Sequence, residues 1–222
     1  MLGGAARAYH HHVRTWRRLI DALGPDAQRL GLRHGATETS IVAAETLMNV
    51  RFPPDFRAWL SIADGQEIDS LSILPTAGWL ISIDRLLEKW VDERQYDLED
   101  YDDPETRGAG AIRPFVYHPR RITIGGAQYL DYDNTLLDLI PGPDGVSGQV
   151  INFVSECDFV VLAECFDAYL DRVAELLEAK QLVVGESEYG SPCLNAATHE
   201  GRWEDLLRPK KRRAPRKKAS KS

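Results

Sequence analysis

The first half of the chain places apolar residues at three- and four-residue intervals, the spacing of amphipathic helices. This pattern predicts helices over residues 5–23, from about Glu38 to Met48, from Pro54 to about Ala63, and within 82–93. The side chains expected to face the core are Val13, Trp16, Ile20 and Leu23, then Ile41, Ala44 and Met48, then Phe56, Trp59, Leu60 and Ala63, and finally Ile83, Leu86, Leu87, Trp90 and Val91.

Residues with special backbone preferences mark the ends of these helices. Gly24-Pro25 is expected to end the first helix, and Thr37 is expected to cap the second. Pro54 suits the first turn of the third helix, where its missing N–H is not needed. Gly65 is expected to end that helix in the left-handed conformation.

From Arg120 the pattern changes to short runs of β-branched and aromatic residues, which are "RITIGG", "AQYLDYD", "TLLDLI", "GQVINFV" and "DFVVLAE". They are too close together for crossover helices, so they predict an antiparallel meander. A helix over 164–180 follows, with "LVVGES" as a candidate last strand and loop after Tyr189, apart from a short amphipathic segment near Trp203. The residues of this helix expected to face the core are Phe166, Leu170, Val173 and Leu177. The fold class is therefore α+β, a single domain with an antiparallel sheet flanked by helices.

The stretch "PGPDGVSG" at 141–148 raises the question of a phosphate-binding loop. No Lys accompanies its glycines, and a strand rather than a helix is expected to follow it, so neither nucleotide-binding pattern is met. A hairpin connection fits better: Pro141 ends the incoming strand, Gly145 and Gly148 permit the turn, and Gln149 begins the return strand.

Composition is that of a globular protein large enough to bury a core without disulfide bonds: 222 residues, 43% hydrophobic and 27% charged. The three cysteines follow no paired spacing, which favours a reducing compartment. No apolar run reaches the roughly 18 residues of a membrane span, and no signal core precedes Trp16. We therefore expect a cytoplasmic protein without a membrane partner.

Motifs of nucleophilic, metal or cofactor chemistry are missing from the sequence. It has no GxSxG and no HExxH, and no nucleophile is tied to His34 or His118. Adjacent histidines at 10–12 point in different directions on a helix and cannot converge on one ion. We expect no catalytic residues, no metal and no cofactor, and hence not an enzyme.

The net charge of −7 conceals two opposite regions. The last fifteen residues, 208–222, carry nine Lys or Arg and no acid. Residues 1–207 therefore hold 18 basic and 34 acidic residues, a net charge of −16. The tail has no apolar side chain larger than alanine or proline and is expected to be disordered. It can attract nucleic acid, fold back on the acidic body, or aid solubility, and the sequence leaves these three roles open.

Acidic residues are densest between Asp84 and Glu105, a stretch that contains ten acidic and three basic residues. Such a run is either a solvated surface or a docking face on which acids steer a basic partner and tyrosines anchor it. On the second interpretation the partner-binding residues are Tyr96, Asp97, Glu99, Asp100, Tyr101, Asp102 and Asp103.

Several stretches follow one another in an order that resembles the SUKH superfamily, over roughly residues 35–180. They are "FPPDFRAWLSIADG", "WLISIDRLLEKW", "RRITIGG", "LLDLIPGPDGVSGQVI" and "FVVLAECFDAYLDRVAELLE". The most specific parts are Pro54-Asp55-Phe56, Asp64-Gly65 and the run with Asp138, Pro141, Gly148 and Gln149. The resemblance makes Trp59, Gly65, Asp138, Pro141, Gly148 and Gln149 structural motif residues.

That superfamily includes fungal cell-wall assembly regulators and bacterial immunity proteins that neutralise secreted polymorphic toxins by binding. The resemblance therefore implies a non-enzymatic immunity protein whose cognate toxin is a basic protein, such as a nuclease or deaminase, blocked at its active site. The alternative is a regulator or scaffold of the same fold whose basic tail engages nucleic acid or another acidic partner. The expected organisation is a helical extension at 1–34, a SUKH-like domain at 35–190, an extension at 191–207 and the tail at 208–222.

Overall fold

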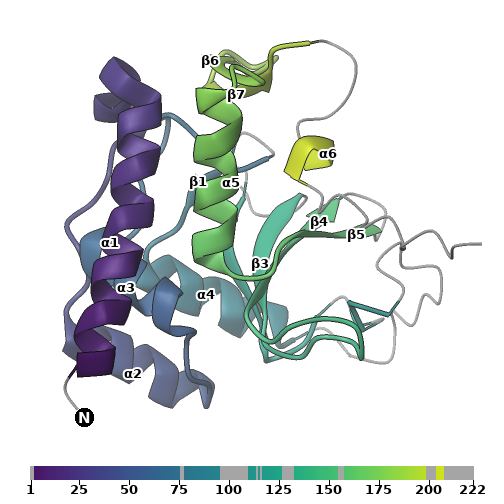
Figure 1. The fold of residues 1–222 in the computed structure, drawn as a ribbon. Coiled ribbons are helices and arrows are strands. Elements are labelled where there is room, and N and C mark those ends of the chain that lie inside the picture. Colours follow the sequence, from purple (N-terminus) through teal and green to yellow (C-terminus); the bar gives the residue numbers. More distant parts are fainter. Residues whose placement is uncertain are drawn as a thin grey trace, which may run out of the picture.

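A computed structural model describes most of the chain, shown in Figure 1. The described residues are 3–75, 78–95, 110–113, 115, 117–126, 133–154, 158–198 and 204–207.

Five antiparallel strands form one sheet in the order in which they occur along the chain, so the predicted meander is confirmed. These strands are β1 (Trp79–Leu80), β2 (Arg121–Gly126), β3 (Asn134–Asp138), β4 (Gln149–Val154) and β5 (Asp158–Ala163). The predicted run "AQYLDYD" lies mostly at 127–132, outside the described residues.

Helices gather on one side of this sheet, with α1 beside α5 (Figure 1). The helices are α1 (Gly3–Leu23), a 3₁₀ helix η1 (Gly24–Leu30), α2 (Glu38–Met48), α3 (Pro54–Ile62), α4 (Ile83–Glu93), α5 (Phe166–Glu178) and α6 (Glu204–Leu207). Helices on one face of an antiparallel sheet confirm the α+β class.

Helix starts follow the predicted capping chemistry. The Thr37 hydroxyl accepts a hydrogen bond from the Ser40 backbone N–H at 3.1 Å, which satisfies one of the free donors at the start of α2. Ser82 does the same for Arg85 at the start of α4, at 3.4 Å. Pro54 is the first residue of α3, as expected.

The core-facing prediction for Val91 was wrong. In α4 the buried residues are Ile83, Leu86, Trp90 and Glu93, which leaves Val91 56% exposed. The buried face of α4 differs from the predicted face because Trp90 and Glu93 both make hydrogen bonds toward β2. In α1 Leu19 is fully buried, and the predicted Ile20 is partly buried and packs against the main core.

The predicted loop after Tyr189 is instead partly a strand. Residues of β7 (Pro192–Ala196) pair antiparallel with β6 (Leu182–Glu186) in a separate two-stranded sheet. The hairpin therefore runs across residue 190. Leu182 and Leu194 are buried in the main core, which gives this hairpin its apolar contact. The run "PCLNA" was missed because it has no β-branched or aromatic residue and begins with proline.

Gly65 has the predicted positive φ of +78°, but it does not cap a helix. The helix ends at Ile62, and its C-cap Ala63 has an extended backbone. The requirement for glycine comes instead from close backbone packing, because a Cβ atom at this position would lie 2.6 Å from the carbonyl carbon of Ile81.

The main core joins the N-terminal helix to the rest of the domain. The rings of Trp16 in α1 and Trp59 in α3 meet edge to face with centroids 4.7 Å apart, and Trp59 also contacts Phe166 of α5 at 5.7 Å. Polar contacts reinforce this packing, since Arg18 donates to Glu178 at 2.7 and 2.9 Å. The α1 helix is thus an integral part of the folded unit.

The other face of the sheet carries a smaller apolar cluster formed by Ile112, Leu136, Ile151 and Phe159. Among the described residues, Ala111 and Tyr117 of the segment before β2 pack against it, as do Phe153 and Val161 of the sheet itself. This face holds the polar network described next.

Candidate functional site

The loop between β3 and β4 is a hairpin connection, as predicted. Asp138 pairs with Gln149 across it, and the Gly148 N–H donates to the Asp138 carbonyl at 2.8 Å. The N–H groups of Gly142, Asp144 and Gly145 also donate to carbonyl oxygens within the protein. These donors are already used, which leaves the loop unsuited to cradle a phosphate.

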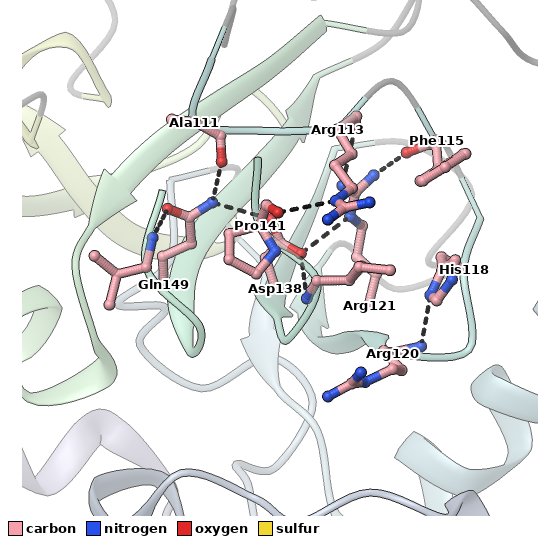
Figure 2. A network of polar contacts seen from close by, with 11 residues as sticks. Ala111, Arg113, Phe115, His118, Arg120, Arg121, Asp138, Pro141 and Gln149 are labelled. Atoms are coloured by element: carbon pink, nitrogen blue, oxygen red, sulfur yellow. Dashed lines mark hydrogen bonds and ion pairs between the residues drawn. The ribbon is translucent and has the colours of Figure 1, made fainter. Parts of the chain in front are cut away.

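The side chain of Gln149 links three parts of the chain. Its amide nitrogen donates to Asp138 Oδ2 at 3.0 Å and to the Ala111 carbonyl at 2.9 Å, while its oxygen accepts from the Val146 N–H at 3.2 Å. Figure 2 shows this amide between the loop and the segment at Ala111. Gln149 therefore fixes the loop to its neighbours with every polar atom of its side chain in use.

Beside it lies an ion pair with no solvent exposure at either side chain. Arg121 Nε is 3.7 Å from Asp138 Oδ1, beyond hydrogen-bonding distance, so the attraction is electrostatic. The guanidinium donates to the carbonyl oxygens of Phe115 and Arg113 and lies 4.8 Å from the centre of the Phe159 ring. Burial lowers the pKa of Arg121, and the Asp138 carboxylate opposes that effect.

These contacts fix a segment that we call the strap, defined as the described residues between 110 and 120 (Figure 2). The Arg113 side chain donates to the Pro141 carbonyl at 3.0 Å. The strap lies so close to the hairpin loop that a Cβ atom on Gly145 would be 2.2 Å from the Ala111 carbonyl oxygen. Burial, with the positive charges of Arg121 and Arg120, lowers the pKa of His118.

The end of α4 is fixed to the same region from the other side. Trp90 Nε1 donates to the Pro119 carbonyl at 2.9 Å, and the Thr123 hydroxyl donates to Glu93 at 2.8 Å. Burial raises the pKa of Glu93, partly offset by that hydrogen bond and by Lys89. The chain is therefore held in place on both sides of residues 96–109.

All seven predicted partner-binding residues lie in that interval: Tyr96, Asp97, Glu99, Asp100, Tyr101, Asp102 and Asp103. Residues 96–109 are outside the described part of the chain, as is the basic tail at 208–222. Their role stays a prediction, while their attachment points, Gln95 and Gly110, are described.

The six motif residues fall into two groups. Asp138, Pro141, Gly148 and Gln149 belong to the hairpin network, whereas Trp59 lies in the main core and Gly65 packs against the backbone of Ile81. Their acidic neighbours serve as caps: Asp55 accepts from the Asp167 N–H at the start of α5, at 3.1 Å, and Asp64 accepts from the Ile83 N–H at the start of α4, at 2.8 Å. The motif thus sets the geometry of the fold.

Sequence reasoning missed Arg121 and Glu93. Arg121 stands beside the exposed Arg120 at the start of a strand, and nothing in "RRITIGG" indicates which arginine turns inward. The available signal was Asp138, an acid within an apolar run, since a carboxylate buried in a sheet needs a positive or hydrogen-bonding partner. Glu93 carried no such signal.

A groove of about 1280 Å³ opens on the edge of this region, between α2, α3 and the hairpin loop. We call it the arginine groove; its charged lining residues other than His12 are Glu38, Glu45, Arg51, Arg57 and Arg120. Arg57 pairs with both Glu38 and Glu45, and the hydrogen bond that it donates to Glu45 raises the pKa of Arg57. Leu139 and Ser147, from either side of the hairpin loop, complete the wall.

Candidate chemistry elsewhere is limited. Burial raises the thiol pKa of Cys165 and of Cys193, so both are poor nucleophiles at neutral pH. Among the described residues, no cluster of three or more His, Cys, Asp or Glu is placed to hold a metal ion. No helix within that part of the chain is long and apolar enough to cross a membrane.

The profile of the SMI1 / KNR4 family (SUKH-1) matches residues 35–172. No curated protein sequence matches the chain. The matched region begins before α2 and ends within α5, so it contains the hairpin network, the strap, the arginine groove apart from His12, and all five strands of the main sheet.

The buried ion pair generates the first prediction. Replacing Asp138 with Ala leaves the Arg121 guanidinium buried without its counterion and removes acceptors from Gln149 and Ile140. We expect a loss of about 3–5 kcal/mol in the free energy of unfolding, measured by urea denaturation. Asp144→Ala, at an exposed position of the same loop, should change it by less than about 0.5 kcal/mol. Equal effects of the two variants would contradict the assignment.

Glu93 generates a pH prediction. Its folded pKa is raised, so the folded state holds a proton that the unfolded state has released. Its contribution to stability is therefore lost as pH rises from about 4.5 through the folded pKa. Glu93→Gln, which keeps an acceptor for Thr123, should gain stability relative to the parent as pH rises across that window. Denaturation curves at several pH values test this, and a gap between the two proteins that stays constant with pH would refute it.

Proposed function

The chain belongs to the SMI1 / KNR4 family (SUKH-1), and from this premise we propose that it is an immunity protein that binds and neutralises a cognate secreted toxin. The family is known to include toxin-immunity proteins and is generally non-catalytic. The protein would then act by occupying the toxin's active site rather than by chemistry of its own.

Charge supports a basic toxin, such as a nuclease or deaminase. Residues 1–207 carry a net charge of −16, and enzymes that act on nucleic acid expose basic substrate-binding surfaces. An acidic body attracts such a surface over long range and accelerates association. The charge thus favours a partner whose own substrate is a polyanion.

The observation that carries the choice of interface is the anchoring of the acidic segment, defined as residues 96–109. Hydrogen bonds of Trp90 and Glu93 fix the chain before it, and the Ala111 contacts to Gly142 and Gln149 fix the chain after it. Anchored ends limit the conformational entropy that an interface segment loses when it binds. We propose that Tyr96, Asp97, Glu99, Asp100, Tyr101, Asp102 and Asp103 meet the toxin there.

The interface is tested by reversing charge within the segment. Asp100→Lys, Asp102→Lys and Asp103→Lys together should slow association with the toxin encoded by the adjacent gene by about 10-fold or more at low salt. The salt dependence of the rate should weaken as well. Stopped-flow or surface plasmon resonance measurements supply both quantities.

The matched control reverses three exposed acids elsewhere, Glu164→Lys, Glu186→Lys and Glu188→Lys, for the same change in net charge. It should slow association less than the acidic-segment variant. If both variants behave alike, overall charge rather than the segment is responsible. If no adjacent gene encodes a toxin and expression of the chain protects cells from none, the immunity function itself is wrong.

A second function is favoured by the tail, whose nine cations in residues 208–222 suit a nucleic-acid or other acidic partner. A regulator of this kind would depend on the tail, whereas an immunity protein would not. Buried Leu207 of α6 packs in the main core, and the Arg172 guanidinium donates to the Leu206 carbonyl at 2.9 and 3.2 Å, so the chain is fixed just before the tail begins.

Deleting residues 208–222 separates the two functions. Because the truncation leaves α6 intact, we expect an unchanged melting temperature and full protection against the toxin, measured by survival of cells that express both proteins. Loss of protection by a folded truncated chain would favour the regulatory function. Replacing the nine basic residues with Gln in the full-length chain shows whether any loss is due to charge or to length.

A further inference from the structure

The arginine groove differs in charge from the rest of the acidic body. Arg57 is committed to Glu38 and Glu45, and these three side chains together carry a net charge of −1, which Arg51 and Arg120 bring to +1. Arg51 and Arg120 are both exposed, and neither side chain has an ion-pair partner among the described residues. The groove therefore presents two available guanidinium groups within a body of net charge −16.

Besides these cations the groove has apolar lining residues. Val42 of α2 is 45% exposed, and Pro53, Pro54 and Leu139 also line the groove. Proline rings and aliphatic side chains contact apolar groups but satisfy no polar backbone. A ligand that covers them must bring apolar side chains of its own next to its charged groups.

The walls are held in place before any ligand arrives. Glu45 accepts from the Phe52 N–H at 2.8 Å and from Arg57 at 2.5 Å, which ties α2 to the loop before α3 and to α3 itself. On the opposite wall, a Cβ atom on Gly148 would lie 3.0 Å from the Pro53 ring, so the hairpin loop packs directly against that loop. A preformed groove costs little to organise on binding.

We propose that the arginine groove binds an extended acidic peptide segment of a partner protein, with carboxylates on Arg51 and Arg120 and apolar side chains over Val42 and Pro54. The proposal goes beyond the immunity function, because it does not depend on the partner being a toxin. It assigns the groove a ligand of the opposite charge to the one that the acidic segment would take.

The size and charge of the groove favour an acidic peptide over a small anion or a nucleic acid. The volume of about 1280 Å³ exceeds the roughly 300–1,000 Å³ typical of small-molecule pockets. A small anion would leave the apolar lining uncovered. Nucleic acid would meet the long-range repulsion of the acidic body around the two arginines. An acidic peptide matches the arginines while bringing far less charge than a nucleic acid, and arginine suits carboxylate recognition because it can bind both oxygens.

The test uses the full chain and three fluorescein-labelled peptides that repeat Glu-Leu-Pro, Gln-Leu-Pro or Lys-Leu-Pro. Fluorescence anisotropy should show binding of the Glu peptide only, with a Kd on the order of 1 mM or tighter. Arg51→Glu with Arg120→Glu should weaken it by at least about 10-fold. Arg14→Glu with Arg17→Glu, which reverses two exposed arginines of α1 outside the groove lining, should leave it nearly unchanged.

Four outcomes would overturn the proposal: no binding of the Glu peptide, equal binding of the Gln peptide, equal loss in the control variant, or tighter binding of an oligonucleotide with the same sensitivity to the arginine variant.

A variant with Asp97→Asn, Glu99→Gln and Asp100→Asn tests whether the acidic segment of the same chain competes for the groove. If that variant binds the Glu peptide more than about 10-fold tighter, the chain's own acidic segment is the occupant and a partner is not required. Melting temperatures of all variants confirm folding.

Discussion

The buried ion pair between Arg121 and Asp138 is the constraint around which the second face of the sheet is built. Burying an arginine is costly unless its donors find acceptors, and Asp138 alone does not supply them, because its nearest carboxylate oxygen is 3.7 Å from Nε. The carbonyl oxygens of Arg113 and Phe115 supply the rest. The strap must therefore lie across the sheet, and Gln149 completes the arrangement by holding Asp138 and Ala111 at once.

This arrangement explains how one domain can combine a fixed frame with a long acidic segment. The segment leaves the frame after α4, where Trp90 and Glu93 contact the strap and β2, and returns at Gly110 against the hairpin loop. Both attachment points belong to the same hydrogen-bonded region. The contacts that fix these attachment points are all made by residues outside 96–109, so the described frame and the proposed interface come from different parts of the chain.

The sequence predicted those features of the structure that depend on residues close together in the chain. Thr37 and the spacing of Ile41, Ala44 and Met48 predicted α2 to the residue, because capping and helical periodicity act within a few positions. The meander followed from short strand spacing alone. Two predictions failed because they depend on contacts between distant segments. Val91 was expected to face the core, but the contact of Trp90 with Pro119 helps to set the orientation of α4. The chain after Tyr189 was expected to be loop, but β7 pairs with β6 and bridges to Ser72.

The candidate site shows the same difference between features set by nearby residues and features set by distant contacts. Asp138 and Gln149 were identified through the resemblance, yet Arg121, the ion-pair partner of Asp138, was not, since pairing across strands is invisible in a single sequence. The arginine groove was missed for the same reason, as Arg51 comes from the loop before α3, Arg57 from α3 and Arg120 from the residue before β2. An acidic body alone would attract many basic proteins without distinction. The arginine groove binds carboxylates and apolar side chains, which is a second requirement, opposite in charge to the first. Specificity increases when one partner must satisfy both requirements.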